Sequence, residues 1–276
     1  MIDTLKIMSF NLRADFKHDK QNGWAFRKEY AMQMIKDSNA TIIGVQELLP
    51  KMRSDVETLL INYKVLGTGR YNGTKESGDE HADIIIKQAD AEAEFYKTFW
   101  LSKNNEEVSR AYYAFFPRIC TVAEIYLNDL GIYVRVFNTH FDHICGMARV
   151  LGVNIILRAM SELNDEKNMP NILMGDMNAW PKSKPIRILR ENLHPYKNIK
   201  LTDVYSACNT KEIKNTHHGF KQTGFVSWLI DRAPIDYIFV SDEFEVLDAH
   251  IDCSSYNGRF PSDHFPLVAT LKLKKQ

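Results

Sequence analysis

The chain has 276 residues, of which 45% are hydrophobic, so it is long enough to bury a large core. Lys and Arg together number 35, as do Asp and Glu, and the formal net charge of +0 excludes a global positive field that would attract a polyanion. No apolar run approaches the roughly 18 residues of a membrane helix, and the first residues lack the pattern of a signal peptide, so we expect a cytoplasmic protein without membrane insertion.

Segments rich in β-branched and aromatic residues recur along the chain. In chain order they predict strands at Leu5–Leu12, Thr41–Gln46, Ile84–Lys87, Thr98–Leu101, Ile119–Leu127, Ile132–His140, Asn171–Gly175, Ile235–Val240 and Leu267–Leu273. Helical periodicity between some of them predicts helices at Trp24–Asp37 and Gly146–Leu163. Stretches of Gly, Asn, Lys and Ser predict surface loops at Gly67–Asp79, Lys103–Val108 and Ala207–Lys221. This mixture indicates an α/β or α+β fold.

The chain shows no break in composition. It has no low-complexity linker and no internal repeat, which predicts a single domain over residues 1–276. Its cysteines are scattered without a Cys-x-x-Cys pair, so reduced thiols are favoured over a zinc site or a disulfide framework. Nothing in the sequence indicates an obligate protein partner.

Polar side chains capable of chemistry repeatedly stand where an apolar strand ends. They are Asn11, Glu47, the segment Asn138 to His140 and the segment Asp176 to Asn178, while Asp263 with His264 precedes the final strand and Asp236 stands at the start of its strand. A rigid strand end is a good place from which to aim a side chain into a shared site. The set consists of carboxylates, carboxamides and histidines, which suits a hard, oxygen-preferring cation such as Mg²⁺ or Mn²⁺.

Each fragment taken alone has a structural explanation. Asn11 can form a strand-terminal turn, Glu47 can be the first polar residue of a helix, and Asp176 with Asn178 can form an Asx turn. A lone histidine is more often a hydrogen-bonded structural residue than a catalyst.

Taken together, the fragments resemble the endonuclease/exonuclease/phosphatase superfamily, which has the deoxyribonuclease-I-like fold. The resemblance covers essentially the whole chain and rests on six blocks in family order: Ser9-Phe10-Asn11, Gln46-Glu47, Asn138-Thr139-His140, Gly175-Asp176-Met177-Asn178, Ile235-Asp236-Tyr237 and Ser262-Asp263-His264. It implies a two-sheet, four-layer α/β/β/α sandwich with flanking helices and a site at one edge between the sheets.

The resemblance also implies roles for the metal-site residues. Glu47 resembles the principal ligand of a Mg²⁺ or Mn²⁺ ion, with Asn11 and Asp263 close to the same ion. Asp176 resembles the carboxylate that activates the attacking water or handles the leaving group, and Asn178 resembles a phosphate-oxygen ligand.

Two histidine pairs follow from the same resemblance. His264 resembles the imidazole that contacts the scissile phosphate, with Asp236 as its orienting acid. His140 resembles the second histidine, for which Glu80 is a plausible partner. Arg118 resembles a phosphate-contacting arginine, with a surface salt bridge as the alternative.

Further motifs resemble a largely uncharacterised bacterial branch of this superfamily that is similar to the deadenylase-like nucleases. Among them, His143 and His218 are expected to line the pocket and read the substrate, although His143 could equally cap the following helix. The main interpretation is a metal-dependent phosphodiesterase or nuclease acting on nucleic acid or a nucleotide. The alternative is hydrolysis of a small phosphoester such as a sugar phosphate, an inositol phosphate or a phospholipid head group. A non-catalytic binding domain of the same fold is the remote alternative.

Overall fold

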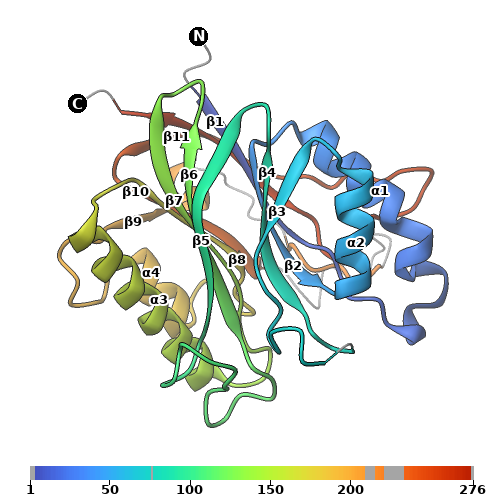
Figure 1. Cartoon of the computed structure of the whole chain (residues 1–276), viewed down its shortest axis with the longest axis horizontal. Helices are drawn as coiled ribbons and strands as arrows, with labels where there is room; N and C mark the ends of the chain where they lie inside the picture. Colours follow the sequence, from blue (N-terminus) through green and yellow to red (C-terminus); the bar gives the residue numbers. More distant parts are fainter. Residues whose placement is uncertain (1–3, 76, 209–214, 221–232, 275–276) are drawn as a thin grey trace.

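Two six-stranded sheets stack face to face between helices in a computed structural model that describes residues 4–75, 77–208, 215–220 and 233–274 (Figure 1). One sheet, sheet A, has the spatial order β11 (Phe244–Ile251), β12 (Leu267–Leu273), β1 (Thr4–Asn11), β2 (Ile42–Leu48), β4 (His81–Lys87) and β3 (Tyr63–Leu66). The other, sheet B, has the order β5 (Ala91–Trp100), β6 (Ile119–Leu127), β7 (Ile132–His140), β8 (Asn171–Asp176), β10 (Asp236–Ser241) and β9 (Leu201–Asp203).

Helices cover the outer face of each sheet. The helices α1 (Trp24–Ser38) and α2 (Pro50–Leu59) flank sheet A, and α3 (Gly146–Glu166) and α4 (Lys184–Arg190) flank sheet B (Figure 1). Short helical segments occur at Lys17–Asn22 (η1) and Val204–Ala207 (α5). The two-sheet sandwich with flanking helices that the resemblance implied is therefore confirmed. No helix in the described part of the chain is long and apolar enough to cross a membrane.

The central strands are apolar on both faces because both faces are buried. In β1, Ile7 belongs to the core between the two sheets, whereas its neighbour Met8 belongs to the core under α1 and α2. Ile42 and Ile43 of β2 divide in the same way. Successive side chains of a strand point to opposite faces, so each strand contributes to two cores at once.

Two parallel strand pairs determine where the site lies. β1 pairs with β2 through the crossover helix α1, with Asn11 opposite Gln46, and β7 pairs with β8 through α3, with His140 opposite Asp176. In each pair the carboxyl ends of both strands lie at one edge. β10 runs antiparallel to β8, which places Asp236, its first residue, opposite Asp176.

The sheets approach each other closely beneath this edge. A Cβ atom on Gly44 of β2 would lie 2.7 Å from Asn138 Oδ1 of β7, so a larger residue does not fit there. Gly175 of β8 has a φ of 146°, a conformation that side chains rarely adopt, and a Cβ there would collide with the Thr139 carbonyl.

Several elements extend or add to those predicted. The strand predicted at Thr98–Leu101 is the end of the ten-residue β5, and the strand predicted at Ile84–Lys87 begins at His81. The sequence analysis did not predict α2, α4, β3, β9 or β11. β5 and β11 have many exposed polar positions, so their sequences lack the apolar run that marks a buried strand. Part of the loop predicted at Ala207–Lys221 lies outside the described residues.

Candidate active site

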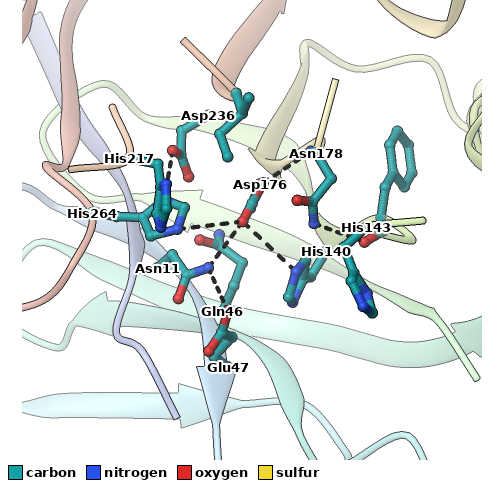
Figure 2. Close-up of polar contacts among 12 residues, drawn as sticks. Asn11, Gln46, Glu47, His140, His143, Asp176, Asn178, His217, Asp236 and His264 are labelled. Atoms are coloured by element: carbon teal, nitrogen blue, oxygen red, sulfur yellow. Dashed lines mark hydrogen bonds and ion pairs between the residues drawn. The ribbon is translucent and has the colours of Figure 1, made fainter. Parts of the chain in front are cut away.

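A pocket of about 380 Å³ lies at the edge of the sandwich where β1, β2, β7 and β8 end. We call it the site pocket. It is lined by Arg13, Phe16, Glu47, Glu80, Phe116, Arg118, His140, His143, Asp176, Asn178, His217, Ile235, Asp263 and His264. Segments far apart in the chain thus meet in one cavity. Asn11 and Asp236 contact residues of its wall. Figure 2 shows them converging with Asp176 and other labelled residues of the pocket.

Asn11 joins the two sheets at the floor of the pocket. Its Nδ2 donates to Glu47 Oε1 at 3.1 Å and to Asp176 Oδ2 at 2.9 Å (Figure 2). Its Oδ1 accepts the backbone N–H of Arg13 at 2.9 Å. The buried amide therefore fixes the relative position of one carboxylate from each sheet.

The backbone of β2 aims Glu47 into the pocket. The β2–β4 pairing is irregular between Val45 and Leu48, and Glu47 has a positive φ of 58°. Such bulges change the direction of a side chain at the end of a strand. The second carboxylate oxygen of Glu47 accepts the N–H of Ala14 at 2.9 Å.

The acids of this wall fit a divalent cation. One ligand atom each of Glu47, His140 and Asp176 lies within 4.8 Å of the others. In the described part of the chain, the ion pairs of Asp176 are with histidines only: His140 Nε2 lies 3.7 Å and His264 Nε2 3.9 Å from its Oδ2. Burial, and next the negative charge of Asp236, raise the pKa of Asp176 to about 7. Buried oxygen donors without a lysine or arginine partner are suited to a hard cation.

Asp263, which is grouped with Glu47 and Asn11 in the resemblance, lines the same pocket as Glu47 but has other side chains as its nearest partners. It lies with His217 and His264, and its Oδ2 is 3.6 Å from His217 Nε2 and 3.5 Å from Arg13 Nε. Burial opposes ionisation of Asp263, but the bond to His217 and the nearby positive charges lower its pKa well below the ordinary value.

His264 and Asp236 form a buried pair. Their Nδ1 and Oδ2 atoms are 2.9 Å apart (Figure 2). Burial disfavours the charged imidazole, but the charge of Asp236 outweighs this effect and raises the pKa of His264 to about 10. Asp236 therefore also fixes the tautomer and the orientation of the ring.

His140 lies on the opposite side of Asp176. Its Nδ1 is 4.0 Å from Glu80 Oε2, and Glu80 in turn pairs with the buried Arg70 at 3.0 Å. Burial, and next the positive charge of Arg118, lower the pKa of His140 well below its ordinary value. His140 and His264 thus have opposite pKa shifts.

Asp176 and Asn178 form a local turn as well as part of the site. The backbone N–H of Asn178 donates to Asp176 Oδ1 at 2.9 Å, and Asn178 Nδ2 donates to the carbonyl of Phe141 at 3.1 Å. Asn178 has a positive φ of 45°. The Asx turn considered as a structural explanation therefore exists, and it holds Asn178 in the pocket wall.

Arg118 and His143 lie at the pocket mouth. Arg118 Nη2 is 3.0 Å from His143 Nδ1, and Arg118 Nε is 3.9 Å from Asp142 Oδ2. Arg118 is only 8% exposed, so it is not the surface salt bridge considered as an alternative. Helix α3 is instead preceded by a turn in which Asp142 accepts the N–H groups of Ile144 and Cys145. His143 therefore does not cap the helix and lines the pocket instead, while Asp142 holds the turn that precedes α3.

The structure places His217, and not His218, in the site pocket. His217 forms a β-bridge with His264, and the two rings lie 4.8 Å apart. The next side chain along an extended backbone points to the other side. His218 accordingly stacks on Phe265 at 4.1 Å, and it is not among the residues that line the pocket. Burial lowers its pKa to about 4.

Sequence reasoning also missed three arginine and aromatic contributions. Arg13 and Phe16 follow Asn11 and line the pocket, with the Arg13 guanidinium 4.6 Å from the Phe16 ring. Arg27 is buried in α1 and donates to the carbonyls of Leu12, Arg13 and Pro261. Their proximity to Asn11 in the sequence was an available signal for the first two. The role of Arg27 becomes recognisable only in the structure, where the loop after β1 and the segment around Pro261 both bind its guanidinium.

Comparison with known proteins gives a consistent result. A sequence model of the Endonuclease/Exonuclease/phosphatase family matches residues 8–264. No curated protein matches the chain. A solved endonuclease/exonuclease/phosphatase family protein from Bacteroides thetaiotaomicron is 29% identical, with a TM-score of 0.88 over 98% of this chain and 95% of that one.

Two further solved structures are informative. A mannosyl-6-phosphatase from Bacteroides thetaiotaomicron is 30% identical, with a TM-score of 0.87 over 97% of this chain and 99% of that one. The human Nocturnin catalytic domain is 15% identical, with a TM-score of 0.74 over 99% of this chain and 96% of that one, a likeness that concerns the fold alone.

Proposed function

The chain belongs to the endonuclease/exonuclease/phosphatase family and is a hydrolase of phosphoester bonds, and from this premise we propose that its substrates are small phosphomonoesters, sugar phosphates above all. The observation that carries the proposal is that the candidate catalytic groups line a bounded pocket of about 380 Å³. The similarity to a mannosyl-6-phosphatase supports it. The small-molecule alternative thus ranks above the nuclease interpretation, and the non-catalytic domain is set aside.

Two arginines near the site-bearing segments, Arg70 and Arg187, have contacts within the protein. Arg70 is buried, pairs with Glu80, and lies 4.3 Å from the Phe116 ring. Arg187 pairs with Glu191 at 2.9 Å on the surface of α4. A long polyanion needs a continuous basic track. These contacts do not support one, whereas one phosphate group fits the pocket.

The proposed cofactor is a single Mg²⁺ or Mn²⁺ ion. Glu47 would hold it, with Asn11 and Asp263 as further oxygen donors. When bound, the ion supplies positive charge that offsets the charge building up on the phosphate oxygens. The chain's own donors, Arg118 and the Asn178 amide, line the same pocket and suit the remaining phosphate oxygens.

The opposite pKa shifts of the two histidines suggest different tasks. His264 is protonated at neutral pH and can donate from Nε2 to a phosphate oxygen, while Asp236 accepts from its Nδ1. His140 is neutral and can accept a proton or a hydrogen bond. Asp176 lies between the two imidazoles and is proposed to hold the attacking water in line with the leaving group.

The test compares substrates with purified protein in Mg²⁺ and in Mn²⁺. We expect release of inorganic phosphate from mannose 6-phosphate with a kcat/KM at least about 100-fold above that for bis-p-nitrophenyl phosphate or poly(A) RNA, a ratio worth about 2.7 kcal/mol. Glu47→Ala and His264→Ala should each abolish the activity. Cleavage of RNA or of the diester at a comparable or higher rate would favour a nuclease, and full turnover in either variant would remove the assigned site.

A further inference from the structure

A second cavity of about 300 Å³ adjoins the site pocket. The two cavities share His143, Asn178, His217 and Ile235. The second cavity is further lined by Arg149, Ala179, Trp180, Ser183, Asn215 and Ala233. Because these residues line both cavities, the cavities are direct neighbours, and a ligand held by its phosphate in the site pocket can extend into the second one.

The two cavities differ in charge. The site pocket is lined by the carboxylates of Glu47, Glu80, Asp176 and Asp263. Among the described residues that line the second cavity there is no carboxylate, and there is one arginine. The phosphate end of a ligand therefore lies among acids that suit a cation, and the other end meets a neutral-to-positive surface.

Arg149 brings a positive charge to the lining of this second cavity. Its Nη1 donates to the Asp142 carbonyl at 2.8 Å, which fixes the guanidinium at the start of α3. Its Nε is buried and has no hydrogen-bond partner within the part of the chain that the structure describes, so no acceptor there offsets the charge. A half-buried guanidinium held by one neutral carbonyl is suited to attract an anionic group in the cavity.

Trp180 gives the cavity a flat apolar surface. Its side chain is 66% exposed although it lies in a cavity wall, and its carbonyl is fixed by Ser183 Oγ at 2.6 Å. A large aromatic face left uncovered inside a polar cavity is a platform for an amphipathic ligand. The amides of Asn178 and Asn215 and the hydroxyl of Ser183 line the same cavity and suit hydroxyl groups.

We propose that the second cavity is the leaving-group pocket of this phosphatase, and that it selects a polyhydroxylated group of sugar size that carries a second negative charge next to Arg149. The inference rests on the proposed function and deepens it. Trp180 covers the carbon skeleton, the amides bind hydroxyls, and the guanidinium pairs with a carboxylate or a second phosphate.

The decisive test uses two substrates that differ only at the end remote from the phosphate. 6-Phosphogluconate has a carboxylate there, and sorbitol 6-phosphate has a hydroxymethyl group. In the wild-type enzyme, kcat/KM for the first should exceed that for the second by about tenfold, the effect of one charge-assisted hydrogen bond. Arg149→Gln should reduce this ratio to about one, mainly through KM, and Arg149→Lys should retain part of it.

The ratio is internal to each enzyme preparation, so a partly unfolded variant does not distort it. Arg158→Gln, on the exposed face of the same helix where Arg158 pairs with Glu162, is the matched control and should keep the wild-type ratio. In a parallel measurement, Trp180→Ala should raise the KM for mannose 6-phosphate, and Trp180→Phe should restore it.

Three outcomes separate the two proposals. A ratio near one in the wild type, or a tenfold ratio that survives Arg149→Gln, overturns the leaving-group pocket while leaving the phosphatase intact. Failure to hydrolyse any sugar phosphate overturns the proposed function itself. An unchanged KM in Trp180→Ala removes the aromatic platform.

Discussion

The buried pair of His264 and Asp236 shows how one residue can decide the charge of another. Asp236 lies against the imidazole on one side, and its Oδ1 has no partner among the described residues, so its charge acts on His264 and on the neighbouring Asp176. An imidazole in this position would otherwise be neutral because of burial. The acid is therefore expected to matter for the rate although it does not line the pocket.

Asp236→Asn tests this coupling. It keeps the shape of the pair but removes the charge that stabilises the imidazolium, so kcat/KM for a sugar phosphate should fall about 100-fold at pH 7. Steady-state phosphate release measures it. Asp248→Asn, in the exposed pair with His250 on β11, is the matched control and should change nothing. Equal activity of Asp236→Asn and wild type would contradict the role.

Substitution of Glu47 should impair metal binding, whereas substitution of Asp176 should impair the catalytic rate. Glu47→Gln should weaken Mg²⁺ or Mn²⁺ binding by at least about tenfold, because it removes the charge of the proposed principal ligand. Asp176→Asn should retain metal binding and lose rate by about 100-fold. Isothermal calorimetry measures the metal binding and turnover measures the rate. Glu57→Gln, at an exposed position of α2, is the control and should change neither. Abolished metal binding in Asp176→Asn would place that acid on the metal.

For single residues, the sequence predicted which residue types meet in the site but not all of the contacts that they make. Asn11, His140 and Asp176 could be named because each ends a strand, and His264 because it directly precedes the last one. The assignment of His218 failed because a single bridge between His217 and His264 decides which histidine of the doublet faces inward. That register depends on tertiary contacts, which local sequence does not encode.

Among the elements, β8 places a glycine with a positive φ directly before a site residue. Gly175 precedes Asp176, and its φ of 146° lets the strand pass the Thr139 carbonyl. The strand end is thus close enough to β7 for His140 and Asp176 to meet.

Gly175→Ala should lower the free energy of unfolding by more than about 2 kcal/mol, because a clash is added to the cost of a positive φ. Urea denaturation measures it. Gly131→Ala is the matched control: its φ is 65°, and the nearest atom to the added Cβ would be 3.9 Å away. It should cost only about 1 kcal/mol. An equal loss of unfolding free energy in the two variants would mean that β7 and β8 can shift apart with little loss of stability.

The turn before α3 should give a pH-dependent contribution to stability. Burial raises the pKa of Asp142, but the N–H groups of Cys145, Ile144 and Phe115 outweigh burial, and the folded pKa lies below the ordinary value of 3.8. A depressed pKa means that the stabilisation is complete above the unfolded pKa and is lost as the pH falls through the folded pKa.

We therefore expect wild type to exceed Asp142→Asn by about 1 kcal/mol in unfolding free energy from pH 7 to 5. The difference should shrink below about pH 4. Urea titrations at several pH values measure it. A difference that stays constant down to pH 3 would show that the carboxylate charge is not what holds the turn.

The element boundaries show what local pattern can and cannot provide. The helix predicted at Trp24–Asp37 ends within one residue of α1, because α1 packs with one apolar side on sheet A. The edge strand β11 was missed because Glu245, Asp248 and His250 interrupt its apolar positions. Pairing with β12 compensates for that weak pattern, and pairing is a long-range property.

For the whole molecule, cation binding should be linked to folding, because Glu47 and Asp176 come from different sheets and meet only in the folded chain. At a free ion concentration about 100 times the Kd, the unfolding free energy should rise by about 2.7 kcal/mol. Thermal unfolding with Mg²⁺ and with chelator measures it, and Glu47→Gln, with at least tenfold weaker binding, should reduce the shift to about 1.4 kcal/mol or less at the same ion concentration. An equal shift in that variant would place the ion elsewhere.

The position of β12 between β11 and β1 has a consequence for synthesis on the ribosome. β1 is translated first among the described strands and its antiparallel partner β12 last among them, so a nascent chain presents an unpaired β1 edge until β12 has emerged. Asp263 and His264 arrive just before that final strand. Closure of sheet A and completion of the catalytic set therefore coincide. Until β12 is available, the open β1 edge must be kept from pairing with neighbouring chains, and this is a task for chaperones.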